Sequence, residues 1–466
     1  MITPALRHFA MPRPVVPSPA CAPNTVPVPH RLGRLIDIGR SLEGRPLVAH
    51  LRGRADAPLR VLVVAGQHGD EPTSVAAADA LASMPSACLD ESLHLSLHLA
   101  VVARANPDGL HAETRHHAAD LDLNRDHLLL DAPETQALHA FVRGWQPHLV
   151  IDLHTYPARR SALLQHGLVH GADVLFETAT APAARTTLDA TVTASLTDSL
   201  LRRLRQAGLH GGPYVVVSGS GRLRRGTPDG VDLRNGLALR YGVPTLLLEG
   251  RRPSKRVPGA THARTLSALR VTLRAALDWA VVHRDTLTRS RPLPQAGDAV
   301  PLWTRYRRAP TGSPQRACWL PMQYDGRPRV LPTMLPGRYT PRLAVTRATT
   351  LPAAYAVPKT LTPVLDVLRR NGFVLARGRD PVMAEEASVL ALKRSSRPRR
   401  APRQIALRRA ERRIVLSDYV TATTAQPGGH LLAVLLEPAS KYGLARLLPD
   451  ALPLAVGHPY PILRLP

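Results

Sequence analysis

Residues 61–71 read VLVVAGQHGDE, and this stretch decides how the first half of the chain is expected to fold. Its first five residues are apolar and mostly β-branched, as is typical of a buried strand. His68 and Glu71 follow on the turn after that strand. An imidazole and a carboxylate three residues apart can bind one metal ion. The stretch therefore predicts a strand that delivers half of a metal site.

Strands and helices alternate around this stretch. Further strands are predicted over residues 35–38, 47–51, 95–103, 148–153, 214–217 and 245–248, and helices over 72–82, 133–144, 188–207, 231–241 and 259–282. This order predicts an α/β fold, a three-layer α/β/α sandwich with a mixed, largely parallel central sheet. Ligands bind outside the carboxyl ends of such strands. Because His68, His154 and Glu249 each follow such an end, they are expected to lie together.

The chain is expected to form two domains, because 466 residues exceed the usual size of one core. Residues 1–30 are a Pro-rich tail that is predicted to be disordered. Residues 31–286 carry the predicted site. Residues 287–466 predict a smaller β-rich accessory domain, with strands near 344–346, 414–424, 430–436 and 460–465. A basic run at 393–413 is interpreted as a solvated, partly disordered insertion.

The composition excludes several classes of protein. The net charge of +26 comes almost entirely from Arg spread along the chain, so a nucleic-acid partner is not expected. The three cysteines, Cys21, Cys88 and Cys318, form no metal-binding or redox motif, so any metal is expected to bind His and carboxylate. No signal sequence and no apolar run of about 18 residues is recognisable, so a membrane span is not expected and a cytoplasmic location is. The oligomeric state is not predicted.

A catalytic zinc site has three protein ligands and an open position for water. His154 is the expected third ligand beside His68 and Glu71, because a buried strand aims it at the same edge. Glu249 is the candidate general base for activating the water. The alternative for Glu249 is an ordinary carboxylate at a strand edge, or one that is paired with Arg251 or Arg252. The other histidines are interpreted as surface or core residues, namely His94, His98, His116, His117, His139, His166 and His170.

Residues 110–131 predict a long polar loop beside this site, and loops of that length are usually functional. The loop contains Arg115 and the string DLNRD at 122–126. An Arg fork matches a carboxylate, and a second Arg could stabilise a developing oxyanion. The alternative is that these are solvent-exposed charges in an Arg-rich protein.

Six motifs in this order resemble the zinc carboxypeptidases of the M14 type over about residues 31–285. They are GRSLEGRP (39–46), HGDE (68–71), NPDG (106–109), Arg115 with DLNR (122–125), DLHTY (152–156) and LLLEGR (246–251). The resemblance implies that residues 31–286 are a catalytic domain that hydrolyses the C-terminal bond of a peptide with one Zn²⁺. It implies zinc binding by His68, Glu71 and His154, with Glu249 as the base. Asn124 and Arg125 would bind the terminal carboxylate of the substrate, Arg115 would polarise the scissile carbonyl, and Asp122 would orient His68.

The sequence also departs from this family. Digestive members carry a mobile Tyr about 22 residues before the base, and Thr227 stands at that position here, so the role is vacant or is taken by Tyr214 or Tyr241. Residues 218–235 are expected to form a pocket wall with possible contacts to an acidic substrate from Arg222, Arg224, Arg225 and Arg234. The DLHT motif is shared with zinc deacylases of the aspartoacylase and succinylglutamate desuccinylase type. Cleavage of an N-acyl amino acid is therefore the alternative function.

Overall fold

The computed structural model describes residues 34–84, 96–184, 186, 188–217, 222–226, 230–313, 318–335, 338–378, 381–393, 404–452 and 455–466. The Pro-rich tail predicted over residues 1–30 lies outside this part of the chain. Among the described helices, none combines the length and apolarity that crossing a bilayer requires.

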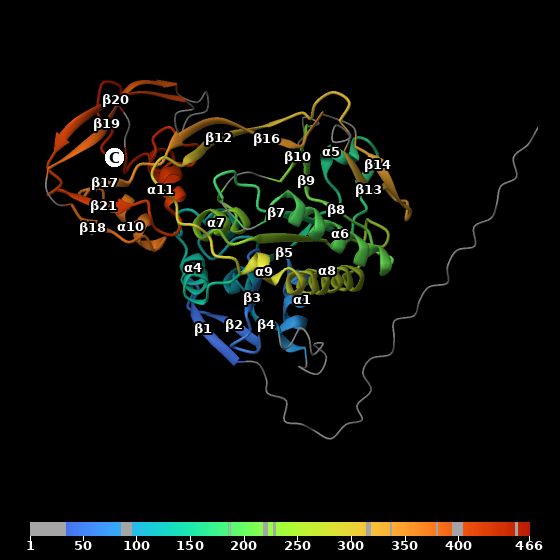
Figure 1. Cartoon of the computed structure of the whole chain (residues 1–466). Coiled ribbons are helices and arrows are strands. Elements are labelled where there is room, and N and C mark those ends of the chain that lie inside the picture. The colour runs from blue at the N-terminus through green and yellow to red at the C-terminus, as the bar shows by residue number, and fades with distance from the viewer. Residues whose placement is uncertain are drawn as a thin grey trace, which may run out of the picture.

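The fold is mixed α/β around an eight-stranded sheet of order β1-β2-β4-β3-β5-β11-β7-β8 (Figure 1). Its strands are β1 (Arg34–Arg40), β2 (Pro46–Gly53), β3 (Leu59–Ala65), β4 (Leu97–Val102), β5 (Leu149–Tyr156), β7 (Val174–Thr178), β8 (Gly211–Pro213) and β11 (Thr245–Arg251). Strands β4, β3, β5 and β11 are mutually parallel, whereas β1, β2 and β7 join them in antiparallel pairs. The expectation of a mixed central sheet is confirmed.

Helices pack on both faces of this sheet because its central strands are apolar on both faces. Along β3, Val61 and Val63 pack in one core with α1 (Pro72–Ser83), α6 (Ala190–Gln206) and α8 (His262–Val282). Leu62 and Val64 pack in a second core with α4 (Pro133–Trp145) and α7 (Leu233–Tyr241). Alternate side chains of β3 therefore pack in two different cores, one on each face of the sheet.

Helix α1 begins at Pro72, directly after the predicted ligand Glu71. Proline is favoured at this position because the first N–H groups of a helix have no intrahelical partner. The chain therefore changes from strand β3 to helix α1 within the few residues that carry the HGDE motif, as the sequence predicts.

The polar loop over residues 110–131 contains little regular structure. Helix α3 (Pro107–His111) overlaps its first two residues, and the short 3-10 helix η2 (Leu123–Arg125) lies within it. The NPDG motif, expected as a turn, caps α3, where the Asn106 side chain accepts a hydrogen bond from the Gly109 N–H at 2.9 Å. A Cβ on Gly69 would lie 1.9 Å from the Gly109 carbonyl carbon, so the HGDE turn contacts this loop backbone to backbone.

The C-terminal part is rich in strands, and its largest sheet has the order β18-β21-β17-β22-β19-β20. The members are β17 (Ala354–Pro358), β18 (Ala376–Arg377), β19 (Val382–Lys393), β20 (Gln404–Ile414), β21 (Tyr419–Thr423) and β22 (Leu463–Leu465). The helices of this part are α10 (Thr362–Arg370), α11 (Gly429–Leu436) and α12 (Leu444–Leu447).

Two expectations about this part need correction. Residues 430–436, expected as a strand, form helix α11, whose residues are all buried. A helix that is buried all round has no polar face, so its apolar run cannot be distinguished from a strand by periodicity. Of the basic run at 393–413, residues 404–413 belong to strand β20, paired with β19, while 394–403 lie outside the described residues.

The C-terminal part packs against the first part through shared sheets and a shared core (Figure 1). Strand β13 (Trp319–Tyr324) pairs with β6 (Leu168–His170), and β15 (Arg338–Thr340) pairs with β10 (Arg222–Arg225). The remaining elements are α5 (Ser161–Leu164), β9 (Val215–Val217), α9 (Arg284–Leu287), β12 (Ala299–Arg307), β14 (Val330–Met334) and β16 (Arg342–Thr350). Because Leu239 of α7 shares a buried core with residues of α10 and α11, the division at residue 286 stays a prediction.

Candidate metal centre and active-site cavity

The structure brings His68, Glu71 and His154 together at the carboxyl ends of β3 and β5. His68 Nδ1 lies 2.9 Å from Glu71 Oε1, and His154 Nδ1 lies 3.1 Å from Glu71 Oε2. The two Nδ1 atoms are 3.1 Å apart. All three side chains are buried. The groups predicted as ligands therefore face one common point.

This donor set fits a zinc ion. Zinc ligands at about 2.0–2.2 Å in a tetrahedral site lie roughly 3.3 Å from one another, close to the separations seen here. Two imidazoles and one carboxylate form a three-ligand set known from catalytic zinc sites, and the arrangement leaves the fourth position open.

The outward nitrogen of each histidine contacts a carboxylate. His68 Nε2 lies 3.2 Å from Asp122 Oδ1, as the sequence predicts for the orienting residue. His154 Nε2 lies 3.1 Å from Asp152 Oδ1, a partner that sequence analysis missed. A metal-binding imidazole usually donates its second N–H to such a group. The signal for Asp152 was present, because it lies two residues before His154 on the same face of β5.

Charge around the ligands favours a cation at their common point. Burial acts to raise the pKa of Glu71, but the two histidines outweigh it, so this pKa is lowered. Burial acts to lower the pKa of His154, but Asp152 and Glu71 outweigh it, so this pKa is raised well above the usual value. Without a metal, a proton supplies the positive charge that the surrounding carboxylates require.

Glu249 lies beside this cluster, opposite His154 in the parallel pairing of β11 and β5. Among the described residues its carboxylate has no hydrogen-bond or ion-pair partner. The structure therefore does not show the alternative, in which Glu249 pairs with Arg251 or Arg252. Arg251 instead binds Asp173 at 2.9 Å. Burial, together with Glu71, raises the pKa of Glu249. A carboxylate with a raised pKa and unused lone pairs suits proton transfer.

The loop residues reach the same site. Arg115 binds Asp122 Oδ2 through Nε at 3.2 Å and Nη2 at 3.0 Å, and its Nη1 lies 3.3 Å from His68 Nδ1. Asn124 is buried, with Nδ2 at 3.1 Å from His154 Nε2 and Oδ1 accepting from the Leu233 N–H at 2.8 Å. Arg125 is exposed and donates to its neighbour's main-chain carbonyl at 2.5 Å. Arg125 therefore keeps donors for a ligand, whereas both ends of the Asn124 amide are already engaged.

These residues line a cavity of about 370 Å³. Five arginines contribute to its wall, namely Arg115, Arg125, Arg160, Arg234 and Arg252. Arg234 is the largest fully buried side chain of the described residues, and Arg252 binds Asp70 at 3.0 Å. Sequence analysis included Arg234 among possible substrate contacts but missed Arg160 and Asp70.

The other expectations for residues 218–235 have mixed outcomes. Arg225 binds Glu177, with Nε 3.0 Å from Oε2, and does not line the cavity. Thr227 lies outside the described residues. Of the two tyrosines considered as substitutes, Tyr214 lines the cavity, and burial raises its pKa to about 12, which keeps the phenol protonated. Tyr241 lies elsewhere, so it cannot take that role.

A buried chain of polar side chains leads from this site to Tyr241. Gln67 Nε2 donates to Asp152 Oδ1 at 2.8 Å, and Gln67 Oε1 lies 2.8 Å from His127 Nε2. His127 Nδ1 lies 3.1 Å from His139 Nε2, and His139 Nδ1 lies 3.3 Å from the Tyr241 hydroxyl. His139, interpreted from the sequence as a core residue, is buried within this chain.

Comparisons with known proteins agree with the resemblance inferred from the motifs. No family model matches the chain. Carboxypeptidase 2 of Trichophyton rubrum is 32% identical over 126 residues, which cover 26% of this chain and 23% of the relative. Murein peptide amidase A of Vibrio campbellii is 34% identical over 111 residues, which cover 24% of this chain and 40% of the relative. The chain thus spans about a quarter of the length of the first relative, and the predicted similarity to carboxypeptidases is confirmed.

Among solved structures, a metallo-carboxypeptidase from Burkholderia cenocepacia is 17% identical. The superposition covers 55% of this chain and 66% of that chain, with a TM-score of 0.41.

Proposed function

We propose that this chain is a zinc-dependent hydrolase of the metallocarboxypeptidase type, which cleaves the C-terminal bond of a peptide. The observation that carries the proposal is that His68, Glu71 and His154 converge on one point, beside a cavity that is also lined by the unpaired carboxylate of Glu249. The proposed scaffold is a three-layer α/β/α sandwich over residues 31–286 with a β-rich accessory domain over 287–466. Helices on both faces of the central sheet support the first part of this description.

In the proposed mechanism, His68 Nδ1, His154 Nδ1 and Glu71 hold one zinc ion. Zinc bound there would polarise the scissile carbonyl and lower the pKa of an attacking water. Glu249 accepts the proton of that water and returns it to the leaving amine. Asp122 and Asp152 hold the two imidazoles in the orientation that presents Nδ1 to the ion.

Arginines bind the charged groups of the substrate in this proposal. Arg125 is exposed at the cavity and keeps guanidinium donors for the terminal carboxylate of a peptide. Arg115 borders the ligand atoms, and its Nη1 is placed to stabilise the oxyanion that forms during attack. The predicted contribution of Asn124 to the carboxylate site requires its side chain to exchange one of its present partners.

Deacylation of an N-acyl amino acid is the second candidate. The cavity volume of about 370 Å³ lies near the lower end of the usual range for small-molecule sites, which favours a small substrate. Both substrates present a free carboxylate next to the bond that is cleaved. Arg125 would bind this carboxylate in either reaction.

The test is an assay of the full, zinc-loaded chain on three matched panels. They contain peptides with a free C-terminus, including cell-wall peptides, the same peptides with an amidated C-terminus, and N-acyl amino acids. Release of the last residue from the free peptides alone is expected, identified by mass spectrometry. Exclusive turnover of the N-acyl amino acids would select the second candidate. Equal cleavage of the amidated peptides would contradict both, because no carboxylate is then available to Arg125.

A further inference from the structure

A second cavity, of about 570 Å³, lies where the C-terminal part meets α4 and α7. It shares no lining residue with the cavity at the metal centre. Helix α7 connects the two cavities, because Arg234 near its start lines the first and Tyr241 at its end lines the second. The segment 289–294 and the loop around residues 426–430 complete the wall.

Every charged side chain on this wall is cationic. The arginines are Arg60, Arg143, Arg240, Arg289 and Arg291, and no carboxylate side chain lines the cavity among the described residues. Within the same part of the chain, none of these five makes an ion pair with a carboxylate. The contrast with the metal-site cavity is clear, because Arg115 and Arg252 there bind Asp122 and Asp70.

Two of these guanidinium groups are partly removed from water without a neutralising partner. Arg291 donates from Nη1 to the Tyr241 carbonyl at 3.1 Å, while its Nε is buried and has no partner among the described residues. Arg240 donates to main-chain carbonyls, from Nε to Asn371 at 2.7 Å and from Nη2 to Gly372 at 3.1 Å. Burial lowers the pKa of both arginines to about 10. Burying unpaired positive charge is costly, so this wall is suited to an anion.

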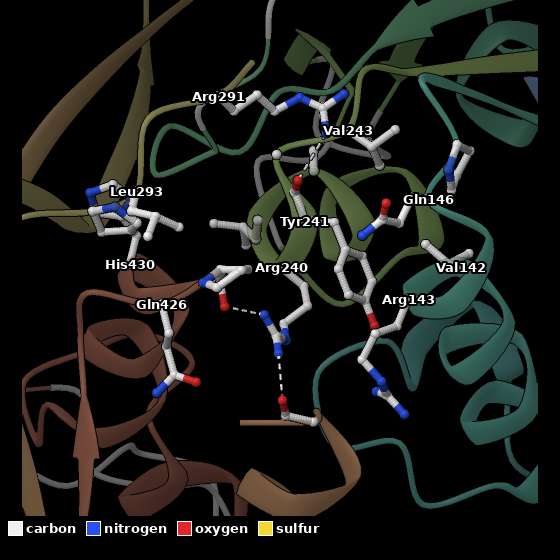
Figure 2. A pocket seen from close by; sticks show the side chains of 18 of the residues that line it. Val142, Arg143, Gln146, Arg240, Tyr241, Val243, Arg291, Leu293, Gln426 and His430 are labelled. Atoms are coloured by element: carbon white, nitrogen blue, oxygen red, sulfur yellow. Dashed lines mark hydrogen bonds between the residues drawn. The ribbon is translucent and has the colours of Figure 1, made fainter. Parts of the chain in front are cut away.

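The remainder of the wall combines apolar residues with polar ones that carry no acidic group, namely Gln146, His148, Ser290, Gln426 and His430. Figure 2 shows Arg291 at the main-chain end of Tyr241, near Val243, and Arg143 at the hydroxyl end of the ring. A volume of about 570 Å³ is within the usual range for a small-molecule site. The wall therefore matches a compound that carries both an oxyanion and an apolar group, because guanidinium pairs with carboxylate or phosphate and the aliphatic side chains do not.

We propose that the cavity at the end of α7 is a binding site for a small organic anion in which a carboxylate or phosphate is joined to an apolar group. Arg291 binds the oxyanion, and the ring of Tyr241 with the neighbouring Val243 packs against the apolar group. The site is separate from the proposed hydrolytic centre. Its existence does not depend on the reaction performed there.

Isothermal titration of the full, zinc-loaded chain tests this proposal at fixed ionic strength. The probes are phenyl phosphate, phenylacetate, inorganic phosphate and the neutral analogue benzyl alcohol. One aromatic anion is expected to bind in a 1:1 ratio, with benzyl alcohol and inorganic phosphate each weaker by about tenfold or more. The better anion identifies whether phosphate or carboxylate is preferred. If neither aromatic anion shows saturable binding, the proposal is wrong.

Variants locate the binding. Arg291→Gln should weaken the preferred anion by about tenfold or more, because it removes a charge-assisted hydrogen bond. Arg291→Lys keeps the charge but not the guanidinium fork, so it should weaken binding by a smaller factor and carries the test if Arg291→Gln impairs folding. The matched control is Arg205→Gln on the exposed face of α6, which should bind normally. Equal weakening by Arg205→Gln would indicate a general effect of the net charge and would overturn the proposal.

His68→Ala separates this cavity from the metal centre. Phosphates and carboxylates can bind zinc, so binding at the hydrolytic site would be lost with this ligand. The proposal expects His68→Ala to bind the anion as well as the unaltered chain. Loss of binding in His68→Ala, with retention in Arg291→Gln, would overturn the proposal and place the anion at the metal.

Discussion

Glu249 and His154 are register partners on the parallel strands β11 and β5. Their side chains therefore leave the sheet on the same face, which places the proposed base next to a proposed zinc ligand. Among the described residues, no group makes a hydrogen bond or an ion pair with the Glu249 carboxylate. Its position is thus set by the sheet and not by a side-chain network, so its charge can be removed with little structural effect.

Replacing Glu249 by Gln should lower turnover by a factor on the order of 100 or more, because the amide cannot accept the proton of water. Zinc content, measured by mass spectrometry of the metal, should stay at the level of the unaltered chain, since Glu249 is not among the three ligands. Turnover within a few-fold of the unaltered chain would remove Glu249 from the role of base.

The raised pKa of Glu249 predicts a pH-dependent stability in the metal-free protein. The unfolded chain releases this proton in the ordinary carboxyl range, whereas the folded chain holds it to higher pH. Stability is therefore lost as pH rises from that range through the raised pKa. Glu249→Gln does not titrate, so it should become increasingly more stable than the unaltered chain across this window. Urea unfolding of both metal-free proteins between about pH 4 and 8 measures the difference, and a constant difference would contradict the assignment.

Asp152→Asn should weaken zinc binding by about 10- to 100-fold, because Asp152 orients His154 and makes the imidazole a stronger ligand. Competition with a chelator measures this affinity. The matched control is Asp285→Asn, since the Asp285 side chain is 90% exposed and lies outside the site. Unchanged affinity in Asp152→Asn would show that Gln67 and Asn124 are sufficient to hold His154.

Gly69→Ala should destabilise the fold by roughly 4 kcal/mol or more, because its Cβ would overlap the backbone of Gly109. Gly144→Ala in helix α4 is the control. A Cβ at Gly144 meets nothing within 4 Å, so the variant should be as stable as the unaltered chain or more stable by up to about 1 kcal/mol. Thermal unfolding of the three proteins checks this. Equal stability of Gly69→Ala would mean that the HGDE turn can move away from α3.

A chain restricted to residues 31–286 should aggregate or fail to unfold cooperatively. It would lose the partners of β6 and β10 and expose the core around Leu239. Exposed strand edges and apolar surface promote association. Size-exclusion chromatography beside the full chain measures the outcome. A monomeric, zinc-binding fragment would establish the predicted domain boundary.

Short-range patterns predicted much of the fold of residues 31–286. The apolar run of β3, the proline that opens α1 and the polar residues after β5 and β11 were sufficient to predict the mixed sheet and the placement of His68, Glu71, His154 and Glu249. These signals are local, because each lies within a few residues of the element that it defines.

Other features depend on contacts between distant residues. The spacing of Asp152 and His154 along β5 is a signal in the sequence, but the contact between them depends on the imidazole orientation, which only the folded site shows. Helix α11 was mistaken for a strand because its burial on all sides comes from the surrounding core. The second cavity could not be predicted, because its arginines lie in segments that are far apart in the sequence, from Arg60 to Arg291, and meet only in the folded chain.

The order of strands in the C-terminal sheet affects how the protein can be made. Strand β22 lies between β17 and β19, and Arg464 within it contacts Glu385 at 2.9 Å. Residues 354–393 are synthesised long before residues 463–465, so this sheet cannot close while its middle strand is still inside the ribosome. The early strands must wait with unpaired edges. Closure of this sheet therefore waits until residues 463–465 have left the ribosome, and until then β17 and β19 each lack one neighbour.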